Sequence, residues 1–140
     1  MPTCVFCDAF ASDADEENFI LERSTHSIVM LNRFPYNGGH LLVLPLQHEG
    51  KIYNLSVDIH NDLMALTAKW SRILEKELRA QGLNVGINMG EAGGGGIPQH
   101  LHIHILPRWK SDTSFLPLLS DTKMVSVDLK AIYAQLKKCV

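Results

Sequence analysis

The segment Pro98–Pro107, PQHLHIHILP, constrains the fold of this 140-residue chain more than any other. Three histidines, His100, His102 and His104, alternate in it with apolar residues. Successive side chains of a β-strand point to opposite faces, and same-face neighbours lie about 6.6 Å apart. The alternation therefore predicts a strand that packs one face into the core and carries three imidazoles on the other.

This strand has three interpretations. The first is a half-buried strand with a histidine-rich solvent side, although histidine has no special β-propensity. The second is a metal site, but three imidazoles on one flat strand span too far for one ion, so further ligands must come from elsewhere. The third is a nucleophilic centre, in which a neutral imidazole nitrogen attacks phosphorus. The other nitrogen then keeps its proton on a backbone carbonyl or a neighbouring histidine.

Four consecutive glycines, Gly93–Gly96, stand just before the histidine strand. Glycine lets backbone N–H groups come close to an anion. A glycine loop that leads into a strand of histidines predicts a phosphate cradle beside a nucleophile, and this favours the third interpretation.

The rest of the chain predicts short strands around two helices. Strands are expected at Phe19–Leu21, Ser27–Leu31, His40–Leu44, Leu83–Met89 and Leu101–Leu106, the last closing at Pro107. The Pro-, Asn- and Gly-rich residues 32–39 predict a turn that makes the flanking strands antiparallel neighbours. Helices are expected at Ser56–Ala80, with Ser56 as N-cap and Gly82 as C-terminal stop, and at Val127–Lys138. The fold class is therefore α+β: an antiparallel sheet with one long central helix and a C-terminal helix, forming a single domain over residues 1–140.

Charge and hydropathy restrict the partners. The chain has 13 Lys+Arg and 15 Asp+Glu, a formal net charge of −2, which disfavours a protein that coats nucleic acid. No apolar run has the length of a membrane span, and MPTCVFCDAF has neither the basic nor the apolar region of a secretory signal. We expect a cytoplasmic protein with no nucleic-acid and no membrane partner.

The three cysteines, Cys4, Cys7 and Cys139, do not indicate a disulfide framework, because their number is odd and low. The C-x-x-C pair predicts half of a metal site. Thioredoxin-like redox chemistry is disfavoured because no helix signal follows Cys7 directly. The acidic segment Ala11–Asn18 is expected to be a loop. Cys139 has no role that the sequence assigns.

Two motifs together resemble those of the histidine triad (HIT) proteins. His100–Leu106, HLHIHIL, fits the family signature H-x-H-x-H followed by two apolar residues. Asn32–Pro45, NRFPYNGGHLLVLP, is similar to its segment N-x-x-P-x-x-x-G-H-x-L-x-x-P. Asn88–Gly90 and the glycine loop stand where the family keeps residues that contact phosphate. The resemblance covers roughly Cys4 to Trp109.

The resemblance implies a small α+β domain, usually a two-fold dimer, that transfers or hydrolyses a nucleotidyl group at its α-phosphorus. His102 would be the nucleophile and form a nucleotidyl-histidine intermediate. His104 would orient and polarise the phosphate, and His100 would hold the tautomer of the nucleophile or ligate zinc. His40 would support the triad from behind, although a packed structural histidine is an equal alternative.

The family also implies nucleotide contacts. Asn32 would contact the ribose, and Ile28, Leu31 and Phe34 would flank the base. Phosphate would be contacted by Asn88 and by four loop residues: Gly94, Gly95, Gly96 and Ile97.

Zinc-containing branches of the family imply a Cys₂His₂ site made by Cys4, Cys7, His48 and His100. These four ligands suit tetrahedral Zn²⁺, and a closed site of this kind is structural rather than catalytic. The alternative is two buried cysteines near a surface histidine.

The stretch Gly95–Gln99 departs from the family's G-Q-[ST]-V, so the glutamine and hydroxyl that contact phosphate are absent. This is similar to the bacterial branch that includes diadenosine tetraphosphate hydrolases and phosphorylases. We therefore expect an enzyme that acts on dinucleoside polyphosphates or related nucleoside phosphoesters. The acceptor is either water or inorganic phosphate. Two other function classes also fit the sequence: a nucleotide-binding regulator with incidental hydrolysis, and a zinc-dependent structural module. Arg108 either reaches outer phosphates or is a solvated charge, and Trp109 either closes the base pocket or lies at a dimer contact.

Overall fold

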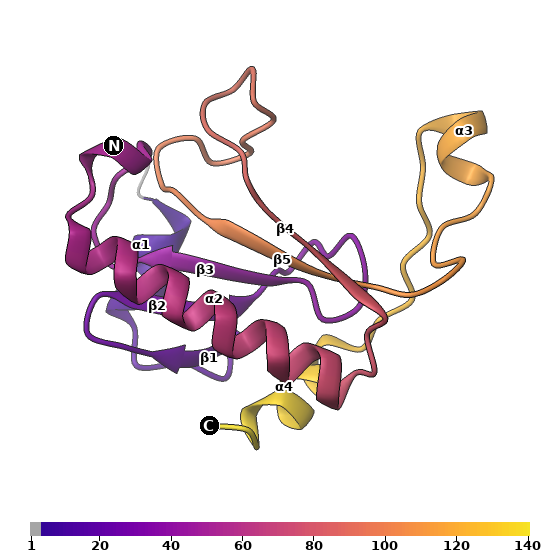
Figure 1. Ribbon diagram of the computed structural model, residues 1–140, viewed down its shortest axis with the longest axis horizontal. Helices are drawn as coiled ribbons and strands as arrows, with labels where there is room; N and C mark the ends of the chain where they lie inside the picture. Colours follow the sequence, from indigo (N-terminus) through magenta and orange to yellow (C-terminus); the bar gives the residue numbers. More distant parts are fainter. Residues whose placement is uncertain (1–3) are drawn as a thin grey trace.

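The computed structural model describes residues 4–140 and contains one five-stranded antiparallel sheet in the order β1-β2-β3-β5-β4 (Figure 1). The strands are β1 (Ile20–Arg23), β2 (Ser27–Leu31), β3 (Leu41–Pro45), β4 (Gly82–Ile87) and β5 (Ile103–Arg108). The helices are α1 (Val5–Ala11), the 3-10 turn η1 (Ile52–Asn54), α2 (Val57–Glu77), α3 (Leu116–Ser120) and α4 (Leu129–Lys137). The α+β class, the antiparallel sheet, the long helix and the C-terminal helix are confirmed.

Helix α2 covers one face of the sheet (Figure 1). Ser56 is its N-cap, as predicted, because its hydroxyl accepts a hydrogen bond from the N–H of Ile59. The core between α2 and the sheet includes the completely buried Trp70, whose indole N–H donates to Glu22 of β1 at 2.7 Å. The apolar cluster on this side of the sheet is the larger of the two.

The end of α2 differs from the prediction. The helix stops at Glu77, Arg79 takes a left-handed φ of 52°, and Gly82 begins β4. The indole N–H of Trp109 contacts the carbonyls of Leu78 (3.3 Å) and Arg79 (3.0 Å) and satisfies backbone groups at the helix end. Trp109 therefore fixes the C-terminus of α2, and it does not line the cavity described below.

The opposite face of the sheet is covered in part by α1. Phe6 of α1 packs there on a smaller cluster that contains Ile20, Ile28, Met30, Leu42 and Leu44. Sequence reasoning missed α1: Cys7 lies within it, and the prediction that no helix follows this residue is wrong. The helix has seven residues and no side-chain N-cap, so local sequence gives little sign of it.

Strand β5 also differs in its bounds, since it begins at Ile103 and runs through Pro107 to Arg108. Its predicted alternation is nevertheless present. Leu101, Ile103 and Ile105 belong to the cluster under α2, and the imidazoles of His100 and His102 both contact Phe6 on the other side.

The C-terminal part of the chain adds two helices. α4 packs against β1 and α2, and the hydroxyl of its Tyr133 donates to the carbonyl of Ile20 at 2.9 Å. The short α3, which was not predicted, stands away from the sheet (Figure 1). Within residues 4–140, none of the helices combines the length and the hydropathy needed to span a membrane.

Candidate active site and metal site

His102 has its ring orientation set by the backbone that precedes it. Its Nδ1 lies 2.9 Å from the carbonyl oxygen of His100. A carbonyl can only accept, so Nδ1 carries the proton and Nε2 keeps a lone pair. The side chain is 7% exposed and its ring centroid lies 4.9 Å from that of His104. His102 therefore presents an unprotonated nitrogen beside a second imidazole.

The tautomer of His104 follows from a chain of hydrogen bonds that starts at the main chain. The backbone N–H of Tyr36 donates to Nδ1 of His40 at 3.2 Å. Nε2 of His40 must then be the protonated nitrogen, and it donates to Nδ1 of His104 at 2.8 Å. A neutral His104 consequently carries its proton on Nε2. That atom is buried without a hydrogen-bond partner within residues 4–140.

This buried N–H donor, without a partner in the described part of the chain, lies beside His102. An anionic oxygen bound there would accept a hydrogen bond from this donor. Burial favours the neutral state of His104 and of His40. It lowers the pKa of His104, with the charge of His102 adding to the effect, and it lowers the pKa of His40 to about 4. The candidate site thus places the imidazole of His102 beside a neutral N–H donor on His104.

His40 is completely buried and contacts His104, which is compatible both with a supporting role and with a packed structural histidine. Tyr36 covers the pair, with its ring centroid 4.5 Å from that of His40 and 5.9 Å from that of His104. Asn32 lies at the same turn, where its Oδ1 accepts the N–H of Phe34 at 2.9 Å. The turn 32–39 therefore holds the histidine strand from one side.

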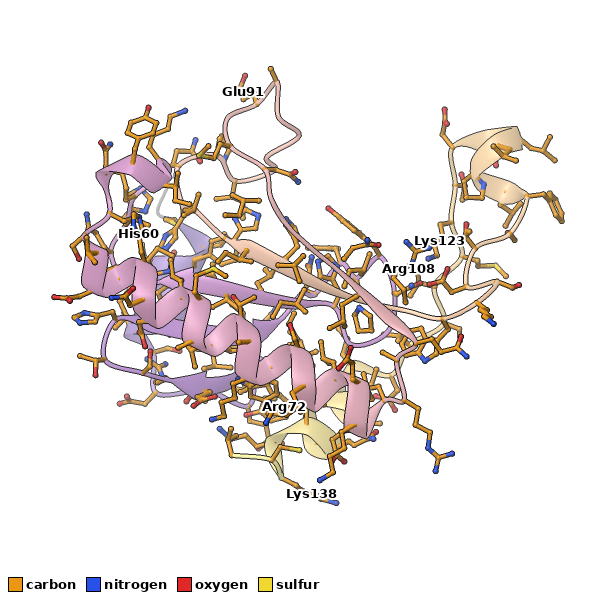
Figure 2. All side chains as sticks on the ribbon, viewed as in Figure 1. His60, Arg72, Glu91, Arg108, Lys123 and Lys138 are labelled. Atoms are coloured by element: carbon orange, nitrogen blue, oxygen red, sulfur yellow. The ribbon has the colours of Figure 1, made fainter. Side chains whose placement is uncertain are left out.

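The glycine loop between β4 and β5 projects beyond the end of the sheet (Figure 1), and Figure 2 shows Glu91 at its tip. Gly94 has a φ of +85°, and a Cβ at Gly93 would lie 2.5 Å from the carbonyl oxygen of Met89. Glycine is required at these positions for the turn itself. A Cβ at Gly94 would also come within 4.0 Å of Nδ2 of Asn88, so the loop lies against this predicted phosphate contact.

A cavity of about 660 Å³ is lined by residues of α1 and the loop after it, of β2 and β3, of the turn after β2 and of the loop before β5. Leu31, Phe34 and Ile97, all predicted to contact nucleotide, line it. Ile28 does not: it is completely buried in the core under α1, which corrects the expectation that it flanks a base. Sequence reasoning missed further lining residues, among them Phe6, Ala9, Met30 and Leu42. Period-two counting from Ile28 would have found Met30 on the same face.

The structure brings Cys4, Cys7, His48 and His100 together, with their ligand atoms within 4.8 Å of one another. Nδ1 of His100 lies 3.5 Å from Sγ of Cys4, 3.6 Å from Sγ of Cys7 and 3.3 Å from Nδ1 of His48. A tetrahedral Zn²⁺ with Zn–N bonds of about 2.05 Å and Zn–S bonds of about 2.3 Å separates its ligand atoms by about 3.3 to 3.8 Å. The spacing of this donor set fits zinc.

The protonation of His100 fits as well. Its Nε2 lies 2.8 Å from the carbonyl oxygen of Pro45, so Nε2 carries the proton and Nδ1 faces the cluster with a lone pair. His100 thus contributes its ring to the cysteine–histidine cluster, and its carbonyl oxygen accepts the hydrogen bond that orients His102. Both roles that were open for His100 are compatible with this geometry.

Arg108 is partly exposed, but its guanidinium is held in place by two neighbours. Its Nε and Nη2 donate to Asp112 at 2.7 and 2.9 Å, and its Nη1 donates to Asn84 at 2.8 Å. The guanidinium in turn holds the pKa of Asp112 well below its usual range.

A histidine strand, a glycine loop and an antiparallel sheet in this arrangement define a histidine triad architecture. Residues 14–111 match the model of the HIT domain, and the chain belongs to this family.

Two curated relatives have named activities. The AP-4-A phosphorylase of Mycobacterium tuberculosis is 36% identical over 112 residues, which are 80% of this chain and 57% of that protein. The asymmetrical bis(5′-nucleosyl)-tetraphosphatase of Schizosaccharomyces pombe is 33% identical over 95 residues, 68% of this chain and 52% of that protein. The chain therefore spans little more than half the length of either relative.

Two solved structures share the fold over most of their length. A Zn-bound histidine triad family protein from Mycobacterium smegmatis has a TM-score of 0.73 and 25% identity, covering 99% of this chain and 98% of that one. A hypothetical histidine triad nucleotide-binding protein from Sulfolobus tokodaii strain 7 has a TM-score of 0.75 and 25% identity, covering 96% and 87%.

Proposed function

We propose that this protein, over residues 1–140, is a single-domain nucleotidyl hydrolase or transferase that acts at the α-phosphorus of dinucleoside polyphosphates. The observation that carries the proposal is the pairing of an unprotonated Nε2 on His102 with an orphaned buried N–H on His104. The named activities of the two curated relatives support the same substrate class.

The reaction follows from these two atoms. The lone pair of His102 Nε2 forms a bond to the α-phosphorus, and the phosphorus–oxygen bond to the leaving phosphate breaks with its electron pair. Nε2–H of His104 donates to the oxygen on which charge develops. An oxygen of the acceptor then attacks, and the nitrogen–phosphorus bond breaks to restore His102. Asn32 holds the ribose, Asn88 and Gly94–Ile97 contact phosphate, and Leu31 and Phe34 flank the base in the cavity.

The acceptor separates two candidate functions. Water gives hydrolysis. Inorganic phosphate gives phosphorolysis, which the 36% identity to a phosphorylase and the changed stretch Gly95–Gln99 favour. Incubation with diadenosine tetraphosphate, with and without phosphate, decides between them. AMP plus ATP independent of phosphate indicates the hydrolase, and ADP plus ATP only with phosphate indicates the phosphorylase. Tight binding without turnover would replace both by a nucleotide-binding regulator.

Structural zinc is part of the proposal. Cys4, Cys7, His48 and His100 would hold the ion, which would pin α1 to the segment before β5 that carries His102. The spacing of the donor set and the Zn-bound relative from M. smegmatis support it.

A homodimer in the cytoplasm completes the proposal. Strand β4 is an edge of the sheet, and Val85 on it and Met64 on α2 are 50% and 59% exposed. All three thiols are free, as expected in a reducing compartment. Sedimentation should give twice the chain mass of 15.6 kDa.

A further inference from the structure

One row of paired residues crosses the sheet on the face opposite α2. Met30 pairs with Leu42, Leu42 with His104, and His104 with Gly86. Directly paired residues share a face, and adjacent strands lie about 4.8 Å apart. Because Met30 and Leu42 line the cavity, the cavity, the catalytic imidazole and Gly86 follow one another along this row.

At the end of this row, two glycines of β4 leave open space above the sheet. A Cβ at Gly86 or at Gly82 would meet no heavy atom within 4 Å, and Asn84 between them is exposed. Neither glycine has a positive φ, so neither a turn nor packing requires glycine at these positions. A glycine inside a strand weakens the strand and often marks the close approach of a ligand.

Arg108 stands at the far end of this surface, paired with Gly82 and about 13 Å along β5 from His104. Figure 2 shows it at the end of β5 away from the loop that carries Glu91. Of the five N–H donors of a guanidinium, two are used by Asp112 and one by Asn84, so two remain. Its side chain is 40% exposed. It is therefore a fixed cation with donors available to a phosphate.

We propose that this strip, made by Gly82, Asn84, Gly86 and Arg108, binds the leaving nucleotide of a dinucleoside polyphosphate. The inference rests on the proposed function and extends it. The α-phosphorus carries its nucleoside on one side and the polyphosphate on another. The cavity takes the first, and the row through His104 directs the second over the bare glycines toward Arg108. The strip thereby selects substrates with a nucleotide leaving group over those with a small one.

Substitution at Gly86 tests the strip, because a β-branched side chain suits a strand and fills the open space. Gly86→Ala and Gly86→Val are compared with wild type on diadenosine tetraphosphate and on adenosine 5′-phosphoramidate, whose leaving group is ammonia. Glu75→Gln, an exposed residue of α2 outside the strip and the cavity, is the control. We expect Gly86→Val to lower kcat/KM about tenfold or more on the dinucleotide and less than about threefold on the phosphoramidate, with Gly86→Ala between.

Inhibition by product gives a second readout. Gly86→Val should raise the inhibition constant of ATP about tenfold and leave that of AMP unchanged. An equal fall on both substrates, or no fall on either, would overturn the strip. Wild-type protein that turns over neither substrate would instead show that the proposed function has failed, and the strip with it.

Discussion

Nε2 of His40 lies 2.8 Å from Nδ1 of His104, which connects the turn after β2 to the histidine strand through one hydrogen bond. Because His40 is itself held by the N–H of Tyr36, the bond fixes the proton of a neutral His104 on Nε2, the buried nitrogen that has no partner within residues 4–140.

Removal of this donor tests its contribution. His40→Leu should lower kcat about a hundredfold, because His104 then loses the bond that sets its tautomer. His40→Gln keeps an N–H donor and should stay within about tenfold of wild type. Steady-state kinetics on diadenosine tetraphosphate measures both. Equal losses in the two variants would mean that His40 acts only by packing.

Stability should depend on pH through the same residue. The pKa of His40 falls from 6.5 to about 4, mainly through burial and then through His104 and His102. Between these values the unfolded chain binds a proton that the folded chain does not. His40 therefore stabilises the fold fully above about pH 6.5, and this contribution is lost as the pH falls toward 4. The loss is on the order of 2–3 kcal/mol.

Urea denaturation at pH 7 and pH 4.5 measures this contribution, with a chelator present so that metal release does not enter. His40→Gln does not titrate there, so its free energy of unfolding should fall less than that of wild type. An equal fall in the free energy of unfolding between pH 7 and pH 4.5 in the two proteins would contradict the assignment.

Zinc should be bound at about one ion per chain and should support the position of α1. Cys7→Ser should lose the metal, lower the Tm by about 10 °C and expose residues 4–11 to proteolysis, because the ligands that hold α1 are gone. Cys139→Ser, outside the cluster, is the control and should keep both metal and Tm. A Cys7→Ser protein with wild-type Tm and full metal content would rule out the site.

Phe34 should act in binding rather than in chemistry. It is 83% exposed and lines the cavity. Phe34→Ala should raise KM about tenfold with kcat nearly unchanged, since a contact to the base is the same in ground and transition states. Tyr53→Ala, at a residue that is 73% exposed and outside the cavity lining, should change neither kcat nor KM. A fall in kcat with constant KM would place Phe34 elsewhere in the mechanism.

Periodicity made much of the fold and site predictable. The alternation over residues 100–105 correctly placed Leu101, Ile103 and Ile105 on one packed face, because one buried face requires period two. The cysteine pair and two histidines were predicted to meet, and they lie together.

Other features depend on contacts that local sequence does not encode. α1 has seven residues and is held against the sheet by Phe6 and by the cysteine cluster, both of which are tertiary. Trp109 contacts carbonyls thirty residues away in the sequence, so its role at the end of α2 has no local sign. Ile28 was expected in the base pocket, but α1 covers it, and α1 was the helix that sequence reasoning lacked.

The covalent intermediate on His102 is the most direct test of the proposed chemistry. Diadenosine tetraphosphate labelled at the α-phosphorus is mixed with enzyme, quenched in base within milliseconds, and the protein is digested and mapped. We expect label on the peptide that contains His102 and none in His102→Ala. The label should be stable in base and released in acid, as expected for a phosphoramidate bond. Turnover that persists in His102→Ala, or label on another residue, would contradict the assignment of His102 as nucleophile.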